Sequence, residues 1–187
     1  MKSKRKSKSK RKTRKRIVSK VYDDGEIMNL NANHNGEPFF RKIFFYSDPP
    51  TPQQQQIVFA ENEIVKILME NPHPNIVRYF NVNSEYVDME LLTTENIELE
   101  QVVEVMEDVK LFLQNLGIMY IDWKLDNIGR DKNGNYKLFD FDASGIADKG
   151  KWIIEPPPYY SYKKAKNSGL TYPIQMDNHS FQAFVSG

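Results

Sequence analysis

Short apolar runs separated by polar turns dominate the first half of the chain. Residues 16–48 contain such runs, broken by "DDG" and "NHNG", a pattern typical of paired strands joined by turns. Residues 48–56, "DPPTPQQQQ", are rich in proline and glutamine and predict a linker. Apolar residues then recur at helical spacing through "IVFAENEIVKILMEN", so we expect a helix over residues 57–70 that ends at "NPHPN".

The second half begins with two more strands and a long helix. Residues 76–92, "IVRYFNVNSEYVDMELL", predict two strands around an "NVNSE" turn. Residues 97–117, "IELEQVVEVMEDVKLFLQNLG", have the spacing of an amphipathic helix, and Gly117 stands where a helix ends. Strands that come first and helices that come later predict an α+β fold with segregated halves.

A hairpin is predicted around the Asn133-Gly134 pair. A type I′ turn needs positive φ at both central positions, and Asn-Gly is its usual sequence. A two-residue turn here would place Asn127 directly opposite Asp140, with both side chains on one face and a few ångströms apart. A register shift of one residue would break this pairing.

This hairpin would gather oxygen ligands. Asp142 is two residues beyond Asp140 and points to the same face, and Asp122 precedes the hairpin on a short loop. Carboxylates facing an amide oxygen form a site for a hard cation, and with so few protein ligands Mg²⁺ completed by water and phosphates fits better than Ca²⁺. The alternative is a solvated hairpin face with polar turn residues. The apolar neighbours favour a packed hairpin: Ile128, Leu138 and Phe139.

The segment "YIDWKLDNIGRDKNGNYKLFDFD" resembles the catalytic loop and metal-binding segment of eukaryotic-type protein kinases. The family pattern is H-R-D-x-x-x-x-N followed by D-F-G. Asp122 matches the catalytic-loop aspartate, Asn127 the metal-binding asparagine and Asp140 the aspartate of D-F-G. Lys124 resembles the lysine common in the serine/threonine-directed branch.

The resemblance extends toward the N-terminus. "FFRKIF" is similar to the strand that carries the nucleotide-clamping lysine, which is best placed at Lys42, with Arg41 as the rival. "ENEIVKILMENPHPNIVRYF" looks like the helix that carries the ion-pairing glutamate, here Glu63. "YVDMELL" looks like the hinge, which implies nucleotide contacts at Glu90 and Leu92.

The resemblance implies a minimal bilobal kinase-like fold. A small antiparallel β lobe with one helix would occupy residues 17–90, and a truncated, mainly helical lobe residues 91–187. "MDNHSFQAF" resembles the start of that lobe's central helix, with Asp177 as its anchoring aspartate. Residues 1–16 would form a disordered basic arm. The implied cofactors are ATP and Mg²⁺.

The sequence also departs from the kinase pattern. A glycine-rich loop should precede Lys42, but the stretch "KVYDDGEIMNLN" offers only Gly25. Tyr120 and Ile121 replace the histidine and arginine of the catalytic loop, so control by activation-loop phosphorylation is not expected. D-F-G becomes D-F-D at Asp142, and no clear A-P-E follows. Short kinase-like proteins of this kind resemble those of large DNA viruses.

Two classes of function follow from these residues. In a serine/threonine protein kinase, Asn127 and Asp140 would hold Mg²⁺, Asp122 would orient the substrate hydroxyl, and Lys124 would neutralise charge on the transferred phosphoryl group. The alternative is a weak or inactive pseudokinase that acts as a binding or scaffold module. A small-molecule kinase is a third reading, which Lys124 disfavours.

Composition adds a basic arm and an expected compartment to this interpretation. Residues 1–16 carry 11 of the 26 lysines and arginines and no acid, which leaves the remainder with a net charge of −10. This arm is expected to contact nucleic acid without sequence specificity or to act as a nuclear signal, the alternative being a solubilising tail. The absence of cysteine and of long apolar runs favours an intracellular protein without membrane contact, in host cytoplasm or nucleus or in a virion. A protein substrate is the expected partner.

Overall fold

The computed structural model describes residues 21–22, 25–28, 38–44 and 49–187. The predicted arm (residues 1–16) and the "NHNG" turn lie outside these residues, as do residues 23–24 of the "DDG" turn. Within the described part the fold is α+β, as predicted, with four α-helices and small antiparallel sheets. None of these helices is long and apolar enough to cross a membrane.

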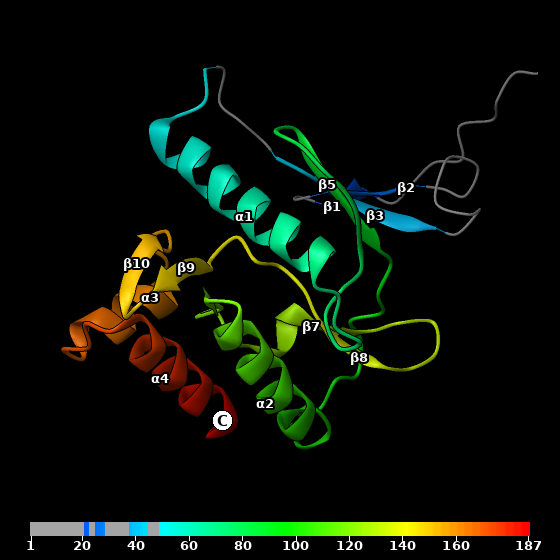
Figure 1. Ribbon diagram of the computed structural model, residues 1–187. Coiled ribbons are helices and arrows are strands. Elements are labelled where there is room, and N and C mark those ends of the chain that lie inside the picture. The colour runs from blue at the N-terminus through cyan, green and yellow to red at the C-terminus, as the bar shows by residue number, and fades with distance from the viewer. Residues whose placement is uncertain (1–20, 23–24, 29–37, 45–48) are drawn as a thin grey trace, which may run out of the picture.

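The largest sheet has five antiparallel strands in the order β1-β2-β3-β5-β4 (Figure 1). Its members are β1 (Val21–Tyr22), β2 (Gly25–Met28), β3 (Phe39–Ile43), β4 (Tyr79–Val82) and β5 (Tyr86–Glu90). The last two are the strands predicted around "NVNSE". In the register of β3 against β5, Arg41 lies opposite Asp88 and Lys42 opposite Val87. Because neighbouring residues of a strand point to opposite faces, the side chains of Arg41 and Lys42 lie on opposite faces of the sheet.

Helix α1 (Pro52–Glu70) packs against β4 and begins five residues earlier than predicted. Thr51 caps it: the Thr51 hydroxyl accepts the Gln54 N–H at 3.2 Å, and the Gln54 side chain accepts the Thr51 N–H at 2.9 Å. Pro52 tolerates the first helical position because that residue's N–H has no helical partner. The predicted linker over residues 48–56 is therefore wrong from Pro52 onward.

The remaining elements lie mainly in the second half of the chain. They are α2 (Leu99–Asn115), β6 (Ile118–Met119), the single 3₁₀ turn Leu125–Asn127, β7 (Ile128–Arg130), β8 (Tyr136–Leu138), β9 (Gly145–Asp148), β10 (Lys151–Ile154), α3 (Tyr160–Asn167) and α4 (Pro173–Val185). Strands β10, β9 and β6 form one small sheet, and β7 pairs with β8. Helix α4 packs against α2 and α3 (Figure 1).

The end of α2 confirms the predicted stop at Gly117. This glycine has φ +77°, and a Cβ there would lie 2.6 Å from the Ala147 carbonyl oxygen of β9. Glycine is therefore needed both for the turn and for the close approach of the next sheet.

One buried cluster joins both halves of the described chain. It combines Ile64 and Val65 of α1 and Val87 of β5 with Met106 and Leu113 of α2. Its aromatic part is Tyr79, Tyr120, Trp123, Phe141, Phe181 and Phe184. Figure 1 shows the chain segment between β8 and β9 running from the α2 side toward α1. Because Phe141 of this segment belongs to the buried cluster, the shared core holds the segment in place between the sheet and α2.

The hairpin forms, but its predicted register is wrong. Ile128 pairs with Leu138 and Arg130 with Tyr136, and the Asp131 N–H donates to the Asn135 carbonyl oxygen at 3.0 Å, so three residues (132–134) rather than two form the loop. The Asp131 side chain accepts the N–H groups of Asn133 and Asn135 at 2.8 and 2.9 Å, which closes the longer loop.

This register changes the partner of Asn127. The Phe139 N–H donates to the Asn127 carbonyl oxygen at 3.0 Å, so Asn127 lies opposite Phe139 rather than Asp140. Asp140 leaves the strand direction with φ +60°, a left-handed conformation that is uncommon outside glycine. Its side chain is positioned by this turn and not by the ladder.

Candidate active site

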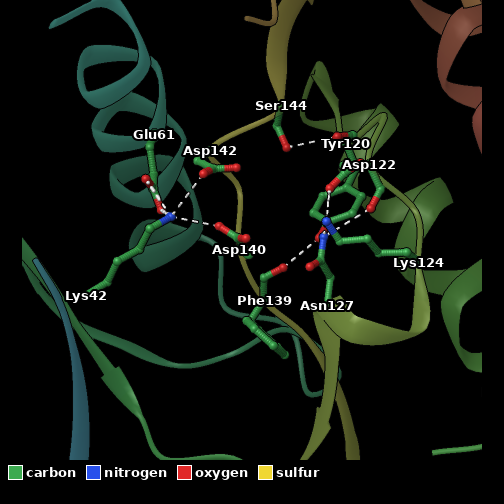
Figure 2. A network of polar contacts seen from close by, with 10 residues as sticks. All are labelled: Lys42, Glu61, Tyr120, Asp122, Lys124, Asn127, Phe139, Asp140, Asp142 and Ser144. Carbon is green, nitrogen blue, oxygen red and sulfur yellow. Dashed lines mark hydrogen bonds and ion pairs between the residues drawn. The ribbon is translucent and has the colours of Figure 1, made fainter. Parts of the chain in front are cut away.

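Three carboxylates converge on the ammonium group of Lys42 (Figure 2). Lys42 Nζ donates to both oxygens of Glu61 at 3.0 and 3.1 Å and to Asp140 Oδ1 at 2.7 Å. Asp142 Oδ2 lies 3.6 Å from the same nitrogen. The group therefore combines β3, α1 and the segment after β8, which are remote in sequence. Of the predicted site residues, Lys42 and Asp140 are brought into direct contact.

The ion-pairing glutamate is Glu61, and the prediction of Glu63 is wrong. Glu63 lies on the outer side of α1, where its carboxylate pairs with Lys66 at 2.6 Å. Glu61 is 1% exposed and shares the buried stripe of α1 with Ile64, Val65 and Leu68. Position 61 is three and seven residues before the apolar positions 64 and 68, a spacing that marks the inner helix face and that identifies Glu61 from sequence.

Arg41, the rival for the clamp position, serves a structural role. Its guanidinium donates to both carboxylate oxygens of the buried Asp88, at 2.6 and 2.8 Å. It also lies 3.7 Å from the centre of the Tyr86 ring. This bidentate and stacked arrangement occupies the guanidinium on the other face of β3. Lys42 is the basic residue of β3 that reaches the carboxylate group.

Burial and mutual attraction set the charges of this group. Burial alone would lower the pKa of Lys42, but Asp140, Glu61 and Asp142 outweigh it and raise that pKa well above its usual value. Burial raises the pKa of Glu61 to about 7, with Lys42 opposing the shift. Asp142 has a raised pKa, first from burial, whereas Lys42 holds the pKa of Asp140 below its usual range against the effect of burial. Asp140 is the anion that keeps the closest contact with Lys42.

A second group forms around Asp122. Lys124 Nζ lies 2.6 Å from Asp122 Oδ2, and the Ser161 hydroxyl donates to Asp122 Oδ1 at 2.8 Å. The Asn127 amide donates to the Asp122 carbonyl oxygen at 3.1 Å and to Oδ2 at 3.3 Å. Burial would lower the pKa of Lys124, but its hydrogen bond to Asp122 raises it. Predicted residues Asp122, Lys124 and Asn127 are thus brought together, and Ser161 is an addition that sequence analysis missed.

Asp177 fixes the backbone of this loop. Its buried carboxylate accepts the Ile121 N–H at 3.0 Å, the Trp123 Nε1–H at 2.8 Å and the Gln114 amide at 2.8 Å. Ile121 has φ +66°, which is strained for a β-branched residue and requires support from its surroundings. The contacts of Asp177 agree with the anchoring position that the resemblance assigned to it.

Tyr120 links the two groups. Its hydroxyl donates to the Phe139 carbonyl oxygen at 2.6 Å, and the Ser144 hydroxyl donates to the Tyr120 carbonyl oxygen at 3.1 Å (Figure 2). These bonds connect the loop of Asp122 to the segment that carries Asp140 and Asp142. Tyr120 therefore ties these two segments together.

A pocket of about 280 Å³ opens beside Lys42 and Asp140. Its lining residues are Phe40, Lys42, Met89, Glu90, Leu91, Leu92, Thr94, Asp126, Phe139 and Asp140. The predicted hinge residues Glu90 and Leu92 both face it. The Glu90 carboxylate is already bonded to the Arg78 N–H at 2.7 Å and to Lys137 Nζ at 3.0 Å, and the Glu90 N–H donates to the Arg78 carbonyl oxygen at 2.9 Å, so neither group is left for an occupant.

The residues present fit a hard cation that is shared with a phosphate group. Among the described residues, no group of three or more histidine, cysteine, aspartate or glutamate side chains has the geometry of a metal site. The carboxylates instead converge on Lys42. Asp140 and Asp142 are each 29% exposed, and with the Asn127 amide they offer oxygen donors to Mg²⁺, which usually takes one or two carboxylates and completes its shell from phosphates and water.

Comparison with known proteins adds no assignment. A scan against protein-family models gives no match, and a search of the curated proteins gives none either.

Proposed function

We propose that this chain is a serine/threonine kinase-like protein that binds ATP with Mg²⁺ and transfers the γ-phosphoryl group to a protein hydroxyl. The observation that carries the proposal is the Lys42–Glu61 pair, which contacts Asp140 beside a pocket. The Asp122–Lys124 pair lies on the other side of Asp140 from Glu61 (Figure 2). Phosphoryl transfer needs a clamped nucleotide, a metal ion and an oriented hydroxyl more than covalent chemistry from the protein.

The nucleotide base would occupy the apolar part of the pocket. Phe40, Met89 and Leu92 line it and offer flat, nonpolar contact to an adenine ring. The backbone carbonyl of Glu90 and the backbone groups of Leu92 would be the polar partners for the ring edge. Lys42, held by Glu61, would bind the inner phosphates at the other end of the pocket.

The metal would be held by Asp140 and Asn127, with Asp142 as a further carboxylate. Held by these residues, Mg²⁺ would supply positive charge to offset the charge that develops during transfer. The contact between Lys42 and Asp140 supports these two roles, because it places the phosphate-binding ammonium group beside the metal-binding carboxylate.

Asp122 would orient the acceptor hydroxyl and accept its proton. Its Oδ1 already accepts a hydroxyl hydrogen bond, from Ser161, which is the geometry that an acceptor alcohol needs. Lys124, on Oδ2, would neutralise charge on the transferred group. A bilobal kinase-like arrangement, with the sheet and α1 covering the nucleotide and α2 and α4 supporting the catalytic loop, belongs to this proposal.

A binding module is the second candidate. It is favoured by the absence of a glycine-rich stretch before Lys42 in the sequence, since backbone N–H groups of such a loop normally cover the phosphates. In this case Lys42, Glu61 and Asp140 would remain as a structural ion-pair network, and the chain would act by docking a partner.

The test is transfer of labelled phosphate from ATP to casein by the purified chain. The proposal predicts incorporation that needs Mg²⁺, stops with EDTA and falls by about a hundredfold in Asp122→Asn, in the range of general-base and positioning effects. A folded Glu63→Gln variant is the matched control, because within the described residues Glu63 forms an ion pair with Lys66 on the surface. Incorporation that Asp122→Asn leaves unchanged would point to a contaminating kinase and contradict the proposal.

A further inference from the structure

Ser161 is held against Asp122 by its own hydroxyl. It lies on the first turn of α3, its side chain is partly buried, and its Oγ donates to Asp122 Oδ1 at 2.8 Å. Other serines nearby have different partners. Ser168, at the opposite end of α3, donates to the Lys164 carbonyl oxygen, and Ser144 donates to that of Tyr120. The hydroxyl of Ser161 therefore occupies the position in which an acceptor alcohol would contact Asp122.

We propose that Ser161 is an internal phosphoryl acceptor, so that the chain phosphorylates itself there and thereby limits its own activity. This inference rests on the proposed function, because ATP is the phosphoryl donor. The Ser161 Oγ–P bond forms while the bond between the γ-phosphorus and the β,γ-bridging oxygen breaks. The Ser161 proton passes to Asp122, and ADP leaves with the electron pair of the broken bond.

The surroundings of Ser161 offer a place for the product phosphate. A second pocket, of about 190 Å³, lies beside Ser161 and includes Lys164 and His179 in its lining. The Nε2 atom of His179 is buried and has no hydrogen-bond partner among the described residues. An ammonium group and an unpaired imidazole nitrogen are suitable partners for phosphate oxygens. A phosphate on Ser161 would therefore be a partner for the unpaired Nε2 atom of His179.

Phosphorylation would then oppose further transfer. A phosphate adds about two negative charges next to the Asp122 carboxylate, which disfavours a second charged substrate there. It also removes the hydroxyl that now bonds Asp122 Oδ1. The expected reaction is a single internal event per molecule, followed by a slower rate on external substrates.

The experiment is site mapping by mass spectrometry after the full chain has been treated with phosphatase and incubated with Mg-ATP. We expect phosphate on Ser161, with a rate constant independent of protein concentration because the catalytic residues and the acceptor lie in one molecule. Asp122→Asn should slow it about a hundredfold. Ser161→Thr should accept phosphate on the threonine, and Ser168→Ala should leave the Ser161 signal unchanged. Casein phosphorylation should slow with time in the wild type and stay linear in Ser161→Ala.

Three results would overturn the inference. If casein is phosphorylated while Ser161 stays unmodified, Ser161 only positions Asp122 and the proposed function stands. If the Ser161 rate rises in proportion to protein concentration, the transfer is between molecules. If neither Ser161 nor casein gains phosphate, both this inference and the proposed function fail.

Discussion

A single ammonium group at Lys42 faces the carboxylates of Glu61, Asp140 and Asp142, and its charge cannot neutralise all three. The excess negative charge can be reduced in two ways. One carboxylate can take up a proton, which the raised pKa of Glu61 reflects, or the group can bind a cation. A divalent ion brought with ATP phosphates would relieve the same repulsion. In the proposed function, this charge balance would favour a metal–nucleotide complex over the free nucleotide.

The protonation of Glu61 gives a pH-dependent stability. Its pKa is about 7 in the folded chain and near 4.5 when unfolded, so the folded state binds more protons between these values and stability falls as pH rises from about 4.5 to 7. Glu61→Gln imitates the protonated form at every pH. We predict that unfolding by urea in nucleotide-free buffer shows Glu61→Gln gaining on the wild type from pH 5 to pH 8, by on the order of 3 kcal/mol. A wild type that gains on the variant over this range would contradict the assignment.

A nucleotide-binding measurement also distinguishes the roles of Glu61 and Glu63. Glu61→Gln weakens the hold on Lys42, so the Mg-ATP dissociation constant should rise about tenfold, as for the loss of a charged hydrogen bond. Glu63→Gln, a surface change on the same helix, should alter it less than twofold, because exposed pairs contribute little. Isothermal titration calorimetry measures both. Equal effects of the two substitutions would mean that Lys42 does not act through Glu61.

At this scale the sequence predicted contacts within one short segment better than contacts that depend on helix packing. Asp122, Lys124 and Asn127 come from one short segment whose spacing is set by local chain geometry, and they meet as expected. The glutamate depends on how α1 is rotated over the sheet. That rotation is determined by packing of residues such as Ile64 and Leu68, and a family resemblance alone does not specify it.

Among the elements, α4 contributes Asp177, whose side chain holds the loop of Asp122. Asp177 accepts three hydrogen bonds from Gln114, Ile121 and Trp123, and it keeps Ile121 at positive φ. Asp177→Asn replaces a carboxylate oxygen by an NH₂ group that must face donors. We predict a loss of about 3 kcal/mol in the free energy of unfolding, measured by urea denaturation.

Asn178→Ala is the control for this substitution. Asn178 is exposed and accepts a hydrogen bond only from Gln114 among the contacts of the described chain, so its loss should cost less than about 1 kcal/mol. Comparable losses in the two variants would show that the carboxylate of Asp177 is not the anchor.

The hairpin shows why element positions were only partly predictable. The Asn133-Gly134 pair correctly marked the turn, but the side chain of Asp131 accepts two backbone N–H groups and lengthens the loop by one residue. A pairing rule that considers only the two turn residues cannot include this competition. Asp140 still reaches Lys42, because its left-handed backbone redirects the chain after β8.

At the scale of the whole molecule, charge is divided between the basic residues 1–16 and an acidic remainder. If the arm contacts nucleic acid through phosphates, deletion of residues 1–16 should weaken binding equally across sequences. Binding of the intact chain should fall steeply with salt, by roughly a factor of 10³ or more between 50 and 200 mM if six or more phosphates are contacted. Fluorescence anisotropy with two unrelated oligonucleotides measures this. Unchanged affinity after deletion would contradict the prediction.

The central claim is that the region between the sheet and the catalytic loop binds Mg-ATP through Asp140. The most direct measurement is the thermal shift of the full chain with Mg-ATP, compared between wild type and Asp140→Asn. An amide is a neutral and poorer ligand for a hard cation. We therefore predict a clear rise in Tm for the wild type, none for Asp140→Asn, and a rise that persists in Asp122→Asn. Identical shifts in wild type and Asp140→Asn would contradict the account.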